Sequence, residues 1–408
     1  MITCLASNLS ILALFKYANF FLANVSVFVQ KFGAEGISYR LDLLLPVGIS
    51  FYTFQAVSYT ADVYRGEIKA EKNILKYALF VSFFPQLVAG PIERSKNLLS
   101  QIQQIEKLKI RNSRDIREGF RLMLWGFFQK LVIADRISIL VSQVYDHFDA
   151  YGFLEITLSS VLFAFQIYCD FGGYSDIARG AARVMGFTLM HNFRQPYLAM
   201  SIKDFWKRWH ISLTSWFTDY LYIPLGGNRK GKGRQYLNQY IVFLTSGLWH
   251  GAQWNYVVWG LIHATLRTAS DMKHKLLINL NAKKGKITFS TRIRKTLTTF
   301  FLIDFAWIFF ASNGFRNGIK MLKQMTTVFM SGKNLGFSLF DWLVLIFGIM
   351  VLVMVDILHE KGVSINTVFD KQENWFRGGV LAFLLWSILL LGVFGEDYVA
   401  REFIYFQF

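Results

Sequence analysis

The chain has 408 residues, of which 53% are hydrophobic and only 17% are charged, and its formal net charge is +17. Soluble domains carry about 25% charged residues, so this composition and its recurring long apolar runs exclude an ordinary soluble protein and indicate a polytopic membrane protein. The positive charge could bind nucleic acid, but the cations gather between apolar runs, as they do in cytoplasmic loops. We therefore expect the positive charge to reflect membrane topology and contact with anionic membrane lipids, and we expect no nucleic acid as a partner.

Apolar runs that could cross or enter a membrane follow one another along the chain. The first run lacks a basic region and a cleavage site, which predicts a retained span rather than a signal peptide. Pro85, Gly90 and Pro91 predict a broken or re-entrant end for the third run, and Gly172–Gly173 predicts a sharp turn after the fifth. We count about nine to eleven segments, including 9–29, 41–59, 74–88, 120–141, 154–171, 236–249, 255–266, 297–311, 339–355 and 378–394.

The predicted fold class is therefore an all-α polytopic membrane protein, with one integral-membrane domain over 1–408. Basic segments at 94–121, 229–234 and 273–295 separate the apolar runs. The positive-inside rule places all three on the cytoplasmic side. Two of them bracket His250, so the segments that carry this residue should start and end inside. A short basic helix at the membrane edge is expected over 177–193.

The stretch 203–251 is the predicted core of the site. Apolar residues at three- and four-residue spacing predict a single basic, tryptophan-rich helix that lies in the interface plane: Phe205, Trp209, Leu213, Trp216 and Tyr220. A glycine turn at 226–227 and a block of cations follow it. The next apolar run then ends at His250.

His210 and His250 are the candidate catalytic residues because ionisable side chains in apolar membrane segments are costly and often functional. A neutral imidazole can accept the proton of an attacking hydroxyl group, and the adjacent Gly251 would let a substrate or backbone approach closely. Alternatively, His250 is a core histidine bonded to a neighbour. His210 could position a substrate or bind a carbonyl group, or it could anchor its helix at the interface.

A polar cluster of Asp170, Tyr174 and Asp176 ends one apolar run. It could orient the catalytic histidine or bind an acyl donor. Alternatively, it caps the run and forms a salt bridge with Arg179 or Arg183.

The loop with Asn228 and Arg229 could contact the phosphates of a nucleotide donor, or it could be a solvated cytoplasmic loop. Its glycine pair follows no strand and is therefore no dinucleotide fingerprint. No metal-ligand spacing occurs, so no bound metal or cofactor is expected, and Cys169 is more typical of a small buried hydrophobe than of a nucleophile. The further donor- or substrate-binding candidates are Trp206, Arg208, Trp209 and Trp249.

Four motifs resemble the membrane-bound O-acyltransferase family: PQLVAGPIERS, QIYCDFGGYSDIARGAARVMGF, NFRQPYLAMSIKDFWKRWHISLTSWFTDYLYIPLGGNRKG and SGLWHGAQWNYVVWGLIHA. Together with the terminal EDYVAREFIYFQF, they are most similar to the branch of alginate O-acetyltransferases and related bacterial polysaccharide acetylation proteins. The resemblance implies a helix bundle around a funnel that crosses the bilayer of a bacterial inner or plasma membrane.

The resemblance also implies a reaction. An acetyl group would pass from a cytoplasmic thioester, acetyl-CoA, toward hydroxyl groups of a cell-envelope polysaccharide such as alginate. His250 corresponds to the family's histidine in the apolar run and would be the general base, and His210 corresponds to its second polar position. An SGNH-hydrolase-like periplasmic or extracellular partner would complete the transfer. D-alanyl transfer from a carrier protein toward teichoic acid is the alternative within the family, and a transporter or scaffold is the alternative outside it.

Two departures from the family pattern stand out. Relatives have further hydrophobic segments before the stretch that here occupies 14–21, so we expect the family's first segments to be lacking. Many relatives also carry arginine at the position of Thr218. If that arginine contacts a donor phosphate, Arg208 or Arg229 would replace it here.

Overall fold

The computed structural model describes residues 1–33, 35–36, 40–43, 46–87, 90–107, 113–279, 288–394 and 403. Across these residues the protein consists of helices and contains no β-strand, which confirms the all-α class. Parts of the basic segments 94–121 and 273–295 and most of the terminal motif at 396–408 lie outside the described residues. The helices are α1 (Ile2–Leu12), α2 (Ala18–Gln30), α3 (Ile49–Tyr64), α4 (Ile74–Val81), α5 (Ser100–Gln103), α6 (Ser113–Phe127), α7 (Asp135–Asp146), α8 (Phe153–Val184), α9 (Ile202–Arg208), α10 (Ile211–Phe217), α11 (Gly231–His250), α12 (Trp254–Asn279), α13 (Phe289–Ala311), α14 (Phe315–Thr327), α15 (Leu339–Glu360), α16 (Ile365–Asp370) and α17 (Asn374–Leu391).

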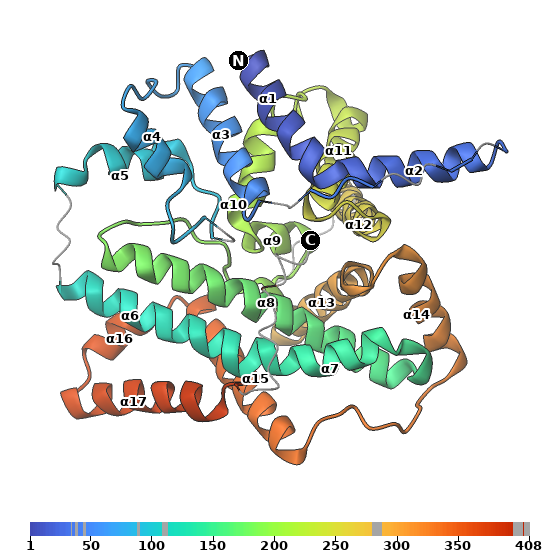
Figure 1. Cartoon of the computed structure of the whole chain (residues 1–408). Helices are drawn as coiled ribbons and strands as arrows, with labels where there is room; N and C mark the ends of the chain where they lie inside the picture. Colours follow the sequence, from blue (N-terminus) through green and yellow to red (C-terminus); the bar gives the residue numbers. More distant parts are fainter. Residues whose placement is uncertain are drawn as a thin grey trace.

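Four helical segments of the described chain are long and apolar enough to cross a membrane: 2–30, α8, α15 and α17. The first joins α1 to α2 through a π-helical turn, Ala13–Tyr17, and the chain bends there (Figure 1), as π-turns commonly cause. With 20, 26 and 23 residues, α11, α12 and α13 also reach the ~30 Å needed to span the hydrocarbon core. The full count of nine to eleven membrane segments stays a prediction.

Proline and glycine set two helix boundaries near the N-terminus. The second run begins its helix at Ile49 rather than at residue 41, because Pro46 lacks a donor and Gly48 adopts a left-handed φ of 76°. The third run forms only the eight residues of α4, and the chain then leaves the helix before Pro85. The predicted broken end of this run is therefore confirmed.

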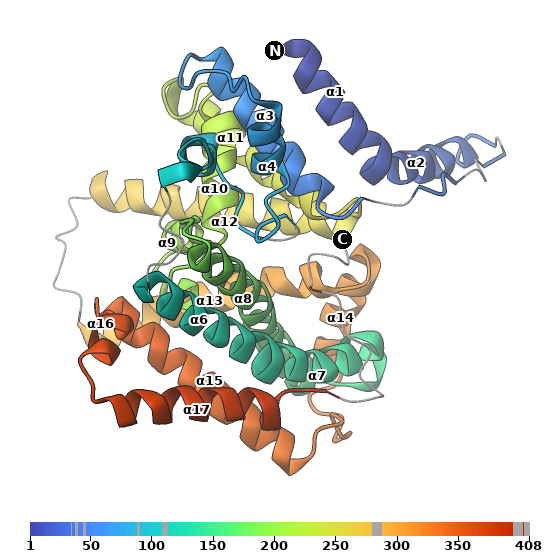
Figure 2. The same ribbon diagram turned by 60° about the vertical axis from the view of Figure 1, so that its left-hand side comes forward.

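The predicted turn at Gly172–Gly173 is wrong, because α8 continues without interruption from Phe153 to Val184. Instead, the glycines allow α8 to pack against α6. A Cβ on Gly173 would lie 2.7 Å from the carbonyl oxygen of Gly126, and a Cβ on Gly180 would lie 2.6 Å from that of Gly119. Small residues at such crossings let two backbones approach closely. The two pairs form a glycine seam (Gly119–Gly180 and Gly126–Gly173) along the adjacent α6 and α8 (Figures 1 and 2).

The helix expected over 177–193 is also wrong, since α8 ends at Val184 and residues 187–193 are not helical. The core stretch departs further from its prediction. A single interfacial helix was expected there, but the structure has two short helices, α9 and α10. They are separated at His210, whose φ is 43°. Trp209, Leu213 and Trp216 are all buried inside the protein. The glycine turn after this stretch is confirmed by the positive φ values of Gly226 and Gly227.

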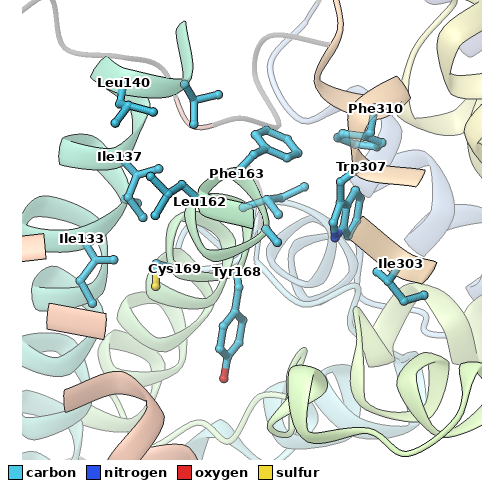
Figure 3. Packing of buried hydrophobic residues seen from close by; sticks show 14 of the residues in the cluster. Ile133, Ile137, Leu140, Leu162, Phe163, Tyr168, Cys169, Ile303, Trp307 and Phe310 are labelled. Atoms are coloured by element: carbon cyan, nitrogen blue, oxygen red, sulfur yellow. The ribbon is translucent and has the colours of Figure 1, made fainter. Parts of the chain in front are cut away.

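The main hydrophobic core lies among α7, α8, α12 and α13, and Figure 3 shows part of it. Ile137 from α7 and Phe163 from α8 are buried there with Trp307 and Phe310 of α13. The ring centroid of Phe163 is 6.3 Å from that of Trp307. This packing fixes α13, and with it Phe310, which forms one wall of the site described next.

Candidate functional site

The two candidate histidines converge inside the protein. His250 is the last residue of α11, and His210 occupies the break between α9 and α10. Their ring centroids are 6.5 Å apart, and the residues are only 5% and 1% exposed. Two imidazoles that lie forty positions apart in the sequence thus share one buried site.

Aromatic rings form the walls of this site. The ring of His250 lies 5.0 Å from Trp249, 5.1 Å from Trp259 and 5.2 Å from Phe310, each near perpendicular. The ring of His210 lies 4.6 Å from Phe171. Such walls lower the local dielectric constant and exclude water, which strengthens every polar interaction with a substrate.

The end of α11 is held by the N-terminal segment. Lys16 Nζ donates hydrogen bonds to the carbonyl oxygens of Trp249, at 2.7 Å, and His250, at 3.3 Å, and Tyr17 donates its hydroxyl hydrogen to the carbonyl of Leu248, at 2.9 Å. The last carbonyls of a helix have no partner within the helix, and a cation is favoured at its negative end. Lys16 therefore positions His250, although it is absent from the predicted site.

His263 is a second residue that the sequence prediction misses. It is fully buried on α12, with its ring 4.7 Å from Trp259 and 4.9 Å from Trp206. Neither ring nitrogen has a hydrogen-bond partner among the described residues. Because Trp259 contacts both His250 and His263, it joins the two histidines. The four-residue spacing from Trp259 to His263 could have indicated a shared helical face.

Gly251, which follows His250, packs closely against an aromatic ring. Its backbone is extended, with φ −166°, and a Cβ there would lie 2.3 Å from Cε2 of Tyr256. The glycine thus leaves room for the ring of Tyr256, which packs 5.1 Å from Phe310. That Gly251 also lets a substrate approach His250 stays a prediction.

Asp170 belongs to a buried ionic cluster. Lys130 Nζ lies 2.5 Å from Asp170 and 2.9 Å from Asp135. Lys130 sits in the π-helical turn Phe128–Ala134 that joins α6 to α7. This cluster connects α8 to that turn. Asp170 was expected to orient a histidine or bind a donor, and in the structure it pairs with a lysine. Tyr174, from the same predicted group, packs its ring 4.7 Å from Phe403.

Asp176 lines a polar cavity of about 410 Å³ between α6, α8, α15 and residues 191–195. Its carboxylate accepts a hydrogen bond from Arg179 at 2.8 Å, which confirms the alternative of a salt bridge. Arg183 and Arg194 also line the cavity. Burial, and then the nearby Arg179 and Arg194, lower the pKa of His191 to about 4. His191 is therefore neutral at pH 7, and its Nε2 can accept a hydrogen bond from Arg179 at 3.0 Å.

This cavity comes close to the histidine pair. Asn192 lines it, and the same residue accepts hydrogen bonds from the backbone N–H of Ile211 at 2.9 Å and from the hydroxyl of Ser212 at 2.6 Å. Gly172 lines it as well, one position after the Phe171 that contacts His210. One layer of residues therefore separates a polar cavity, lined by both arginines and carboxylates, from the buried imidazoles.

The remaining candidates fall into two groups. Arg208 pairs with Asp204 at 2.9 Å and Glu360 at 2.6 Å. Asn228 and Arg229 are exposed before the start of α11, which places them about 30 Å along that helix from His250. The aromatic candidates are buried around the histidines: Trp206, Trp209 and Trp249.

A polytopic all-α membrane protein with two histidines buried in an aromatic interior is the class that these features define. Residues 4–283, which include both histidines, match the family model of the membrane-bound O-acyltransferases (MBOAT), and the chain belongs to this family. The resemblance noted from its motifs is thereby confirmed.

The chain is 37% identical over 340 residues to the probable alginate O-acetylase AlgI of Pseudomonas putida, covering 82% of this chain and 64% of the relative. It is 36% identical over 349 residues to the peptidoglycan O-acetyltransferase of Helicobacter pylori, covering 80% and 64%. It is 28% identical to the teichoic acid D-alanyltransferase of Bacillus subtilis over 68% of this chain and 71% of the relative. The chain thus spans slightly less than two thirds of the length of the first two relatives.

Proposed function

We propose that the protein is a membrane O-acyltransferase that moves an acetyl group from a thioester, acetyl-CoA, toward hydroxyl groups of a cell-envelope polysaccharide. The observation that carries the proposal is the buried pair of His210 and His250, 6.5 Å apart within the segment that matches the family. The names of the relatives, an alginate O-acetylase and a peptidoglycan O-acetyltransferase, favour a polysaccharide acceptor such as alginate.

In this reaction His250 acts as the general base. Its imidazole accepts the proton of the acceptor hydroxyl while the oxygen attacks the thioester carbonyl carbon. The carbon–sulfur bond then breaks, and the imidazolium returns the proton to the leaving thiolate. The products are an ester and a thiol, and no proton is gained or lost overall. His210 positions the acyl carbonyl or the acceptor, and the aromatic walls keep water from hydrolysing the thioester.

The polar cavity supports a place for the donor. Arg179, Arg183 and Arg194 line it, and guanidinium groups bind phosphate oxygens through paired hydrogen bonds. The phosphates of acetyl-CoA would bind there, with the thioester directed at the nearby histidines. We prefer this cavity to Arg208 and Arg229 as the phosphate site because it adjoins the histidines. Arg179 and Arg183 pair with carboxylates, as Arg208 does. An SGNH-hydrolase-like partner outside the membrane would complete the transfer to the polymer.

The test uses the full chain, purified in detergent, with labelled acetyl-CoA and alginate oligosaccharides. We expect turnover of the thioester to free CoA, and acetyl esters on the oligosaccharides when the partner is added. His250→Ala should slow this turnover roughly 10²- to 10⁴-fold. His147→Ala is the matched control, because His147 is exposed beyond the end of α7. Wild-type turnover by a folded His250→Ala variant would refute the catalytic assignment.

The same assay separates the alternatives. D-alanyl transfer is the activity in the name of the B. subtilis relative. It would give an ester product that carries D-alanine in place of acetate, which differs in mass. A transporter or scaffold would leave the thioester intact although the protein is folded.

A further inference from the structure

A second cavity, about 520 Å³ in volume, lies between α6, α15, α16 and α17, the group of helices at the lower left of Figure 1. It is predominantly apolar and adjoins the polar cavity, with which it shares five lining residues: Leu122, Trp125, Val355, His359 and Asn366. Val380 and Phe383 line it on α17 and are themselves 38% and 61% exposed. The cavity is therefore open at the outer surface of the helix bundle.

The polarity of this cavity changes along its length. Its polar lining residues lie at the middle of α6 and at the junction of α15 with α16: Arg121, His359, Ser364 and Asn366. Its apolar lining extends along α15 to Phe347. From Phe347 to His359, α15 rises about 18 Å, which is close to the ~15 Å depth of one leaflet of the hydrocarbon core.

Arg121 is the only residue with a formal charge among the described lining residues. Its guanidinium group stacks over the ring of Phe369 at 4.4 Å and pairs with Asp370 at 2.7 Å. These contacts hold the cation at the polar end of the cavity. Because a guanidinium group has five donors, Arg121 can keep its ion pair with Asp370 and still donate to a phosphate group.

The polar end lies on the side of the molecule that carries the basic segments. Figure 2 shows the end of α12, the start of α6 and the start of α17 together at the left of the view. The positive-inside rule assigns this side to the cytoplasmic leaflet, which is rich in anionic lipids, and basic pockets between membrane helices on that side bind anionic head groups. The outer faces of α15 and α17 are apolar, with Met354 63% and Leu390 69% exposed, as expected for helices that face lipid.

We propose that this cavity binds one anionic glycerophospholipid. Its acyl chain lies between α15 and α17, along Val351 and Leu384, and its phosphate group accepts hydrogen bonds from Arg121. The site is independent of the proposed transferase chemistry.

Native mass spectrometry of the full-length protein tests this proposal. The protein is released from nanodiscs that contain equal amounts of phosphatidylglycerol and phosphatidylcholine, and bound lipid is measured. The wild-type protein should retain one phosphatidylglycerol molecule in preference to phosphatidylcholine. Leu384→Trp, which fills the cavity, should remove this bound lipid. Leu390→Trp on the outer face of the same helix is the matched control and should retain it.

The head-group contact is tested separately. Arg121→Gln should lower the preference for phosphatidylglycerol over phosphatidylcholine about fivefold, the effect of removing one cation near an anionic head group. An unchanged preference in Arg121→Gln would overturn the assignment of the phosphate. Loss of bound lipid to the same extent in Leu384→Trp and Leu390→Trp, or no preferred lipid in the wild-type protein, would overturn the site itself.

Discussion

The glycine seam between α6 and α8 makes opposite predictions for two adjacent residues. A methyl group added at Gly173 would lie 2.7 Å from the carbonyl oxygen of Gly126, a backbone atom that cannot move unless the helices separate. Such overpacking costs about 1–3 kcal/mol, and the better helix propensity of alanine returns about 1 kcal/mol. Gly173→Ala should therefore lower the free energy of unfolding by up to ~2 kcal/mol.

At Gly172 the nearest atom to an added methyl group is Oε1 of Gln129, at 3.2 Å, which is the tip of a side chain that can rotate away. Gly172→Ala should then be neutral or stabilising by up to ~1 kcal/mol. The assay is thermal unfolding of both variants in one detergent. The two Tm values should differ by about 2–6 °C, at ~2 °C per kcal/mol for a large chain. Equal Tm values above the wild-type Tm would show that the helices accommodate the methyl group, and the reasoning would be refuted.

Two further predictions concern side chains that hold loops and helix ends. Lys16→Met removes the donor for two carbonyl groups at the end of α11 and should lower both Tm and the rate of acetyl transfer. The effect should exceed that of Tyr17→Phe, which removes one neutral hydrogen bond. Equal effects of the two variants would contradict the positioning role of Lys16. Burial raises the pKa of Glu93 from 4.5 to about 7, so its protonated form contributes stability below pH 4.5 that is lost as the pH rises through 7. Glu93→Gln should therefore flatten the fall in Tm between pH 5 and 8, and a fall as steep as in the wild-type protein would argue against this titration.

Apolar runs predicted which segments are helical, but the boundaries depended on neighbours that hydropathy does not describe. Gly172 and Gly173 illustrate this point. A glycine pair at the end of an apolar run fits a turn as well as a close helix crossing, and only Gly126 on another helix decides between them. The three- and four-residue spacing of 205–220 likewise fits one helix, whereas the structure breaks it at His210 in a left-handed conformation that tertiary packing must stabilise.

The sequence identified the candidate histidines of the site but not the burial of His210 inside the protein. His250 follows from its place at the end of an apolar run, and its family motif strengthens the assignment. The burial of His210 depends on Phe171 and Trp249, which come from different helices, so residue spacing alone suggested an interfacial position. Lys16 escaped prediction because nothing local relates it to a carbonyl group more than two hundred residues away.

That contact also sets an order for assembly. Lys16 enters the membrane with the helical segment 2–30, yet the carbonyl groups it binds follow 233 and 234 positions later in the chain. Until these acceptors are synthesised, the ammonium group of Lys16 lies in an apolar helix without them, which is unfavourable in free energy. Pairing across such a separation is a late event in folding. When Lys16 binds the last carbonyl groups of α11, segment 2–30 would therefore pack in place and the histidine site would be completed in the same step. Before α11 has been synthesised, segment 2–30 would lack this contact with the rest of the protein.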